Sequence, residues 1–150
     1  MGSEIGETAT MLGGRVAIVT GAGRGIGRAY AEMLAAQGAK VAVVGTMREL
    51  GEHADALHQE AASHIAQRIG WGIDLVLATG EFVAAFERLG GADDRVIAAE
   101  DPVQGYAALR SRLRGDETVL LKGSRGVALE RLIPLLENDF GAESHSHAGA

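Results

Sequence analysis

Short apolar runs alternate along the chain with stretches whose apolar residues recur at helical spacing. The apolar runs predict five strands, over residues 16–20, 41–44, 74–79, 95–99 and 118–122. Helices are predicted after the first strand, over about 54–69 and 81–89, from residue 102 onward, and over about 125–138. Strands that alternate with helices form a parallel sheet covered on both faces. We therefore predict an α/β, three-layer Rossmann-like domain with a five-stranded parallel sheet.

Turn and cap residues set the boundaries of these elements. Asp101 is a suitable N-cap and Pro102 a suitable first residue for the fourth helix, whereas Pro134 should kink or interrupt the last one. Residues 1–12 are expected to form a flexible arm, and residues 142–150, rich in Ser, Gly and Ala, a disordered tail. Residues 13–141 then make up one domain.

A glycine-rich turn follows the first predicted strand and has the form TGxxxGxG. Gly21 lets the chain turn out of the strand, Gly25 lets a ligand approach the backbone, and Gly27 lets the following helix pack closely on the sheet. The free N–H groups of that helix face a bound anion, and Arg24 adds a positive charge beside them. The alternative is a turn that serves packing alone.

Residues 13–44 resemble the amino-terminal βαβ unit of short-chain dehydrogenases and reductases. The resemblance implies that a nicotinamide dinucleotide contacts the turn and the end of the second strand, through Gly21, Arg24, Gly25, Ile26, Gly27 and Thr46. Members that prefer NAD carry a carboxylate where this chain has Gly45. NADP is therefore expected at least as readily as NAD, in either case with weak affinity.

The catalytic Tyr-x-x-x-Lys pair of that family is missing from the sequence. Tyr30 is followed four residues later by Leu34, and Tyr106 by Arg110. An arginine does not replace the lysine without a change of geometry and proton chemistry. The sequence therefore predicts no catalytic residues and no enzyme activity of the chain by itself.

Residues 45–141 resemble the carboxyl-terminal domain of Mur ligases, in particular those that add D-alanyl-D-alanine to the peptidoglycan precursor. The resemblance rests on the segments GTMRELGEHADALHQE, DLVLATGEF and VLLKGSRGVALERLIPLL. The GxxGK(S/T) phosphate loop of those ligases is absent from the sequence, so a ligase reaction by this chain alone is not expected. Two resemblances in one chain suggest a chimera, natural or engineered, joined near residues 41–45.

A second candidate anion site follows the last predicted strand. It consists of Lys122, Gly123, Ser124 and Arg125, with Ser124 as a helix N-cap and two cations beside free backbone donors. Its ligand would be a phosphate, a carboxylate or a nucleotide. The alternative is that Ser124 only caps the helix while both cations remain solvated.

The order of the strands decides whether the two candidate sites are neighbours. A dehydrogenase-like unit pairs its first two strands, whereas the ligase-like domain inserts its last strand between them. The ligase-like part supplies three of the five strands, so we expect its order. The glycine turn and the segment 122–125 then open side by side.

The composition of the chain limits the kinds of binding partner that we expect. A formal net charge of −6 without a basic stripe argues against nucleic acid. The chain has no cysteine and no apolar run long enough to span a membrane, and cytoplasm is the expected location. The spacing of His53, His58 and His64 does not suit a metal site on a helix, and we expect these residues at the edge of a packed helix. The oligomeric state is not predicted.

Three functional hypotheses follow. The first is a chimeric Rossmann-like domain with a weak NADP, NAD or phosphate site and no catalysis. The second is a detached Mur ligase domain that acts with other domains, and the third is an NADP-dependent reductase whose catalytic groups are not recognised.

Overall fold

The computed structural model describes residues 8–12, 16–21, 41–90, 93–115, 117–124 and 127–141, with the backbone alone for residues 8–12 and 16–21. Its strands are β1 (Thr8–Leu12), β2 (Val16–Gly21), β3 (Val41–Val44), β4 (Leu75–Thr79), β5 (Val96–Ala99) and β6 (Thr118–Lys122). Its α-helices are α2 (Ala54–Ala66), α3 (Glu81–Arg88), α4 (Pro102–Arg110) and α5 (Leu132–Phe140). Single 3-10 turns, η2 (Gly51–His53) and η4 (Leu129–Arg131), precede α2 and α5.

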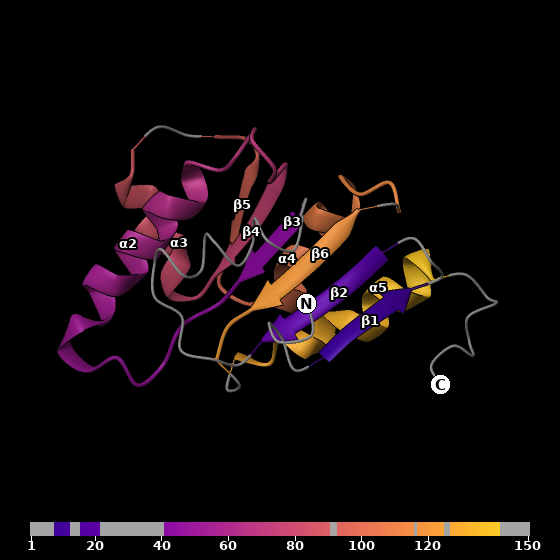
Figure 1. Ribbon diagram of the computed structural model, residues 1–150, viewed down its shortest axis with the longest axis horizontal. Helices are drawn as coiled ribbons and strands as arrows, with labels where there is room; N and C mark the ends of the chain where they lie inside the picture. Colours follow the sequence, from indigo (N-terminus) through magenta and orange to yellow (C-terminus); the bar gives the residue numbers. More distant parts are fainter. Residues whose placement is uncertain are drawn as a thin grey trace.

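The strands form one sheet in the order β1-β2-β6-β3-β4-β5 (Figure 1). Five of them, from β2 to β5 across the sheet, run parallel, which confirms the predicted α/β class and the parallel sheet. The last strand, β6, pairs with both β2 and β3. The strand order expected from the ligase-like part is therefore confirmed.

Strand β1 corrects the expectation of a flexible arm over residues 1–12. Residues Thr8–Leu12 pair antiparallel with β2, with Thr8 opposite Thr20 and Leu12 opposite Val16. Without β1, strand β2 would expose a row of unpaired backbone groups at the edge of the sheet. This pairing satisfies them.

Side chains alternate between the two faces of the sheet and fill two separate cores. On the α2–α3 face, strand residues such as Val44, Val76 and Leu120 pack against Ala61, Ala62, Ile65, Phe82 and Phe86. On the α4–α5 face, residues such as Val43, Leu77 and Leu121 pack against Tyr106, Leu109, Leu132 and Leu136. The two helix pairs thus cover opposite faces, as predicted (Figure 1). No helix in the described residues is long and apolar enough to cross a membrane.

The helix starts are partly as predicted. Asp101 caps α4 by accepting hydrogen bonds from the N–H groups of Val103 (2.9 Å) and Gln104 (3.2 Å). The last helix, however, begins at Leu132 and not near residue 125. Ala128 adopts a left-handed conformation (φ 58°), and η4 lies between it and α5. Pro134 therefore falls in the first turn of α5, where its missing N–H needs no partner.

Candidate functional site

The carboxyl ends of the parallel strands meet at one edge of the sheet. Gly21 of β2 lies opposite Lys122 of β6, and Lys122 lies opposite Val44 of β3. The chain leaves β6 toward α5 on one face and leaves β3 toward α2 on the other. In open α/β sheets, ligands bind at such a switch between strands whose connections diverge. This edge is the candidate functional site.

The glycine turn starts at this edge, in the middle of the sheet. The structure places Gly21 at the end of β2, in register with Lys122. Of the other predicted contacts, Arg24, Gly25, Ile26 and Gly27 lie outside the described residues. Gly21, the first residue of the turn, thus lies beside the last residue of β6, which brings the starts of the two candidate sites together.

Lys122 is buried, with 3% of its surface exposed. Strand alternation places its side chain on the same face as Leu120, the α2–α3 face. Its carbonyl accepts a hydrogen bond from the Gly45 N–H (2.9 Å). The reading in which both cations of the segment 122–125 stay solvated is therefore wrong for Lys122, and Arg125 lies outside the described residues.

Ser124 joins the loop after β6 to the loop after β3. Its N–H donates to the Thr46 carbonyl (3.1 Å), and its Oγ accepts from the Arg48 N–H (2.7 Å). The Ser124 hydroxyl, which was predicted to cap a helix, is thus bonded to the loop after β3, and so is the Ser124 N–H. We call residues 45–48 and 122–124, with these bonds, the edge clasp.

The edge clasp depends on glycine at close approaches. A Cβ on Gly45 would lie 2.7 Å from Val127 Cγ1 and 3.2 Å from Thr79 Oγ1. A Cβ on Gly123 would lie 3.3 Å from Gly45 Cα. Any side chain at either position would push the two loops apart, so their contact explains both glycines.

Thr46, a predicted cofactor contact, is already bonded within the protein. Its Oγ1 accepts from the Glu81 N–H (2.9 Å) and so satisfies a free donor at the start of α3. Gly80, which precedes Glu81, has φ 58°, and a Cβ there would collide with Thr46 Oγ1. The structure thus places Thr46 at the site, with its hydroxyl holding α3 in position.

His58 supports the loop after β3, and the sequence did not reveal this role. Its Nε2 accepts from the Met47 N–H (2.9 Å) and its Nδ1 donates to the Ala54 carbonyl (2.8 Å), a pattern that requires the neutral ring with hydrogen on Nδ1. The ring is 2% exposed and stacks edge-on against Phe82 at 5.0 Å. His58 shares the i, i+3, i+4, i+7 face of α2 with Ala61, Ala62 and Ile65, a signal of burial that could have identified it.

The described residues contain no group of three or more side chains able to hold a metal ion. His53 and His64 lie near Glu52 and Glu60, each pair 3.9 Å apart on the surface. The titratable side chains of the edge clasp are Arg48 and Lys122. Of these two cations, Lys122 is buried and Arg48 is exposed.

Tyr106 and Arg110, the nearest match to a Tyr-x-x-x-Lys pair, hold two helices together. The Tyr106 hydroxyl donates to Asp139 Oδ2 (2.7 Å) and lies 3.1 Å from the Leu135 carbonyl, while Arg110 Nε lies 2.9 Å from the same Asp139 oxygen. Burial and then the hydrogen bond to Asp139 raise the pKa of Tyr106. The contacts of Tyr106 and Arg110 with Asp139 therefore brace α4 against α5.

Comparisons with known proteins point to two groups of enzymes. A dehydrogenase of 2,5-dichloro-2,5-cyclohexadiene-1,4-diol from Sphingobium indicum is 41% identical over 81 residues, which is 54% of this chain and 32% of that protein. The 3-oxoacyl-[acyl-carrier-protein] reductase FabG of Aquifex aeolicus is 40% identical over 79 residues, 52% of this chain and 30% of that protein. A cyclohexanol dehydrogenase from Rhodococcus sp. is 73% identical over 33 residues, 22% of this chain and 12% of that protein.

The similar solved structures are Mur ligases. MurF from Thermotoga maritima, solved with ADP, superposes with a TM-score of 0.66 at 26% identity, over 89% of this chain and 30% of that protein. MurF from Acinetobacter baumannii gives a TM-score of 0.67 at 22% identity, over 87% and 29%. The mixed resemblance seen in the sequence is therefore confirmed.

These findings correct one expectation. The missing Tyr-x-x-x-Lys pair and phosphate loop led to the prediction that the chain by itself is no enzyme, but the proteins it resembles are dehydrogenases, reductases and ligases. The chain spans about a third of the length of the first two dehydrogenase relatives and of the ligases. The profile of the short chain dehydrogenase family matches residues 15–89, half of the sequence. The chain belongs to the short-chain dehydrogenase family.

Proposed function

We propose that the chain binds a nicotinamide dinucleotide at the carboxyl edge of β2 and β6 and forms the cofactor-binding part of a dehydrogenase or reductase. The observation that carries the proposal is the register of Gly21 with Lys122, because it starts the glycine turn beside β6, next to the switch between β6 and β3. The family match includes this turn. The diphosphate is the part of the cofactor that the turn recognises.

The end of β3 favours NADP at least as much as NAD. Gly45 occupies the position where a carboxylate would repel a 2′-phosphate, and contacts with Val127 and Thr79 leave no room for a side chain there. Arg48 lies three residues on, exposed, with its N–H held by Ser124. A guanidinium at this place suits a phosphate better than a ribose hydroxyl.

Weak binding is expected, because Thr46 and Ser124 already use their polar groups within the edge clasp. We propose dissociation constants of about 0.1 to 1 mM, dominated by the diphosphate. A backbone amide NMR titration of the full chain with NADP, NAD and ATP tests this. Shifts at residues 21–27 that saturate with NADP support the proposal, and no shifts with any nucleotide at about 10 mM would overturn it.

Two matched variants separate a site from general charge attraction. Arg24→Gln removes the cation of the turn and should weaken all three nucleotides. Arg88→Gln removes an exposed cation at the end of α3, away from this edge, and should leave the affinities unchanged. Equal losses in both variants would show attraction to the surface as a whole.

A second function is favoured by the strand order. The insertion of β6 between β2 and β3, together with the superposition on MurF over 89% of the chain, supports a ligase domain that works with domains supplied by another polypeptide. On this proposal the chain is a fusion of a dehydrogenase-derived unit to a ligase-derived one. Adding the chain to a MurF that lacks its carboxyl-terminal domain would restore D-alanyl-D-alanine ligation, and no restoration would exclude this role.

A further inference from the structure

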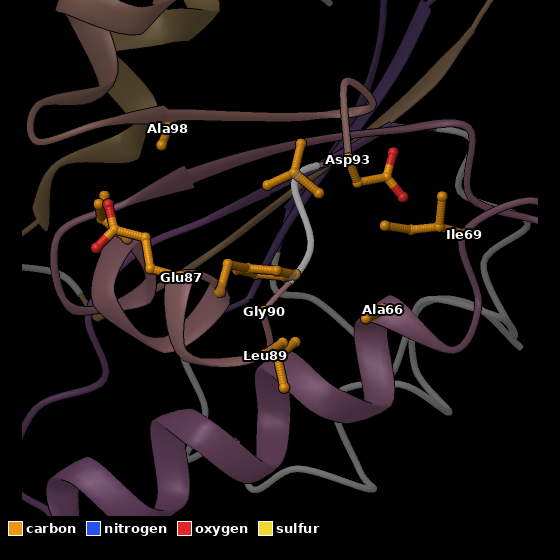
Figure 2. A pocket seen from close by; sticks show the side chains of 10 residues that line it. Ala66, Ile69, Glu87, Leu89, Gly90, Asp93 and Ala98 are labelled. Atoms are coloured by element: carbon orange, nitrogen blue, oxygen red, sulfur yellow. The ribbon is translucent and has the colours of Figure 1, made fainter.

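An apolar cavity of about 390 Å³ lies at the end of the sheet away from β1, beside the edge strand β5 (Figure 2). Its walls come from the last turn of α2 and the residues after it (Ala66, Ile69), from α3 (Val83, Phe86) and from β5 (Val96, Ala98). These are elements of the core and not of the edge clasp. The cavity is therefore separate from the proposed cofactor site.

The cavity exists because small residues occupy its walls. Ile97 and Ala99 pack on the α4–α5 face, so Val96 and Ala98 face the cavity. Ala66 and Ala98 each leave space that a larger side chain would fill. A pocket of 300 Å³ or more is about the size that takes a small organic ligand, and one of about 150 Å³ already takes benzene. This cavity has room for an aromatic ring with a short chain.

Two carboxylates flank the apolar walls in the view of Figure 2, and they differ in charge balance. Asp93 is neutralised by Arg95, whose Nε and Nη2 lie 3.0 Å and 3.1 Å from its two oxygens. The carboxylate of Glu87 makes no hydrogen bond or ion pair with any residue that the structure describes. Among the residues that the structure describes, no cation is paired with the Glu87 carboxylate beside the apolar walls.

We propose that this cavity is a binding site for small amphiphilic ammonium compounds, with the apolar part between α3 and β5 and the ammonium group at Glu87. Apolar burial supplies most of the affinity, since an exposed ion pair contributes little. The charge supplies selectivity. An amine should bind better than an alcohol of the same shape, and a carboxylate worse than either.

The test is a methyl NMR titration of the full chain with 2-phenylethylammonium, 2-phenylethanol and 3-phenylpropionate. We expect shifts at Val83, Val96 and Ala98, with the ammonium compound binding about two- to fivefold more tightly than the alcohol. Glu87→Gln should remove that preference and keep binding of the alcohol. Glu81→Gln, on the same helix but outside the cavity, should change neither.

A filled cavity gives the second control. Ala66→Leu should weaken the binding of all three compounds while the chain stays folded. Three results would overturn the proposal: no shifts with any compound, affinities that are unchanged in Ala66→Leu, or equal affinities for the amine and the carboxylate. None of these depends on nucleotide binding, so the proposal stands or falls separately from the proposed function.

Discussion

The two faces of the sheet are packed by different means. On the α4–α5 face, leucines such as Leu109, Leu132 and Leu136 fill the core, and polar braces tie the helices at its border. On the α2–α3 face, alanines bring the helices close to the sheet, and Phe82 and Phe86 fill what remains. The leucine face is filled mainly by large aliphatic side chains. The alanine face holds the ring of His58 under the edge clasp and leaves a cavity beside β5.

This difference indicates which of the two cores contributes more to the stability of the fold. Interdigitated leucines, together with the hydrogen bonds and ion pairs at their border, allow few alternative packings of this core. Small residues allow close approach, but the shape of the core then depends on a few large rings and on hydrogen bonds. Both candidate binding sites, the edge clasp and the cavity, depend on the alanine face.

The largest effect is expected from breaking the leucine face. Leu132→Ala removes a side chain with no exposed surface and should lower the free energy of unfolding by about 2 to 5 kcal/mol. Leu89→Ala, at a side chain that is 39% exposed, should cost far less. Urea unfolding followed by circular dichroism measures the free energy of unfolding of both variants. Equal decreases would mean that the leucine core does not dominate the stability of the fold.

Two alanines on one helix sharpen the comparison. Ala62→Leu adds volume to a closed part of the alanine face and should destabilise by about 1 to 3 kcal/mol. Ala66→Leu, one turn later, extends into the cavity and should be neutral or stabilising. Thermal unfolding measures the stability of the two variants relative to the unchanged protein. Similar melting temperatures would show that the face is uniformly packed.

His58 tests the polar support of the alanine face. His58→Ala leaves the Met47 N–H without its acceptor and opens a void, which should cost about 1 to 3 kcal/mol. It should also speed amide exchange at Met47 and Arg48, whereas His58→Gln keeps an acceptor and should restore part of both. If Ala and Gln variants exchange alike, the hydrogen bond does not hold the clasp.

Tyr106→Phe should have the smallest effect, and one that depends on pH. The hydrogen bond from Tyr106, and then Arg110, lowers the pKa of Asp139 below its usual 3.8. A carboxylate with a lowered folded-state pKa stabilises the fold above its unfolded pKa and loses that contribution as the pH falls through the folded value. The stability gap between wild type and Tyr106→Phe should therefore narrow below about pH 3.8. A gap that does not vary with pH would exclude this coupling.

The elements with strong local signals were predictable. The spans of β3 and β6 and the cap at Asp101 follow from apolar runs and turn chemistry, and the structure keeps them. The strand order was accessible only through the ligase-like resemblance, since no local pattern decides which strands pair. Strand β1 was missed because only its pairing with β2 in the folded sheet distinguishes its five residues from a terminal arm.

The site was predicted in place more than in detail. Gly21 and Lys122 meet at the expected edge. The bond of the Ser124 hydroxyl to the Arg48 N–H was not predicted, because Arg48 lies 76 residues earlier in the sequence. His58 was missed because its partners, Met47 and Ala54, belong to a loop and a helix start whose contact is tertiary. Local sequence does not encode such pairings.

The central position of β6 in the sheet also affects how the chain folds during its synthesis. During synthesis β2 emerges early, but one of its two sheet partners emerges only when residues 118–122 leave the ribosome. Until then the nascent chain holds two sheet fragments, β1–β2 and β3–β4–β5, each with an open edge. Open edges invite pairing with other chains. A stop codon or a protease cut shortly before residue 118 would therefore yield aggregating fragments and not a smaller functional protein.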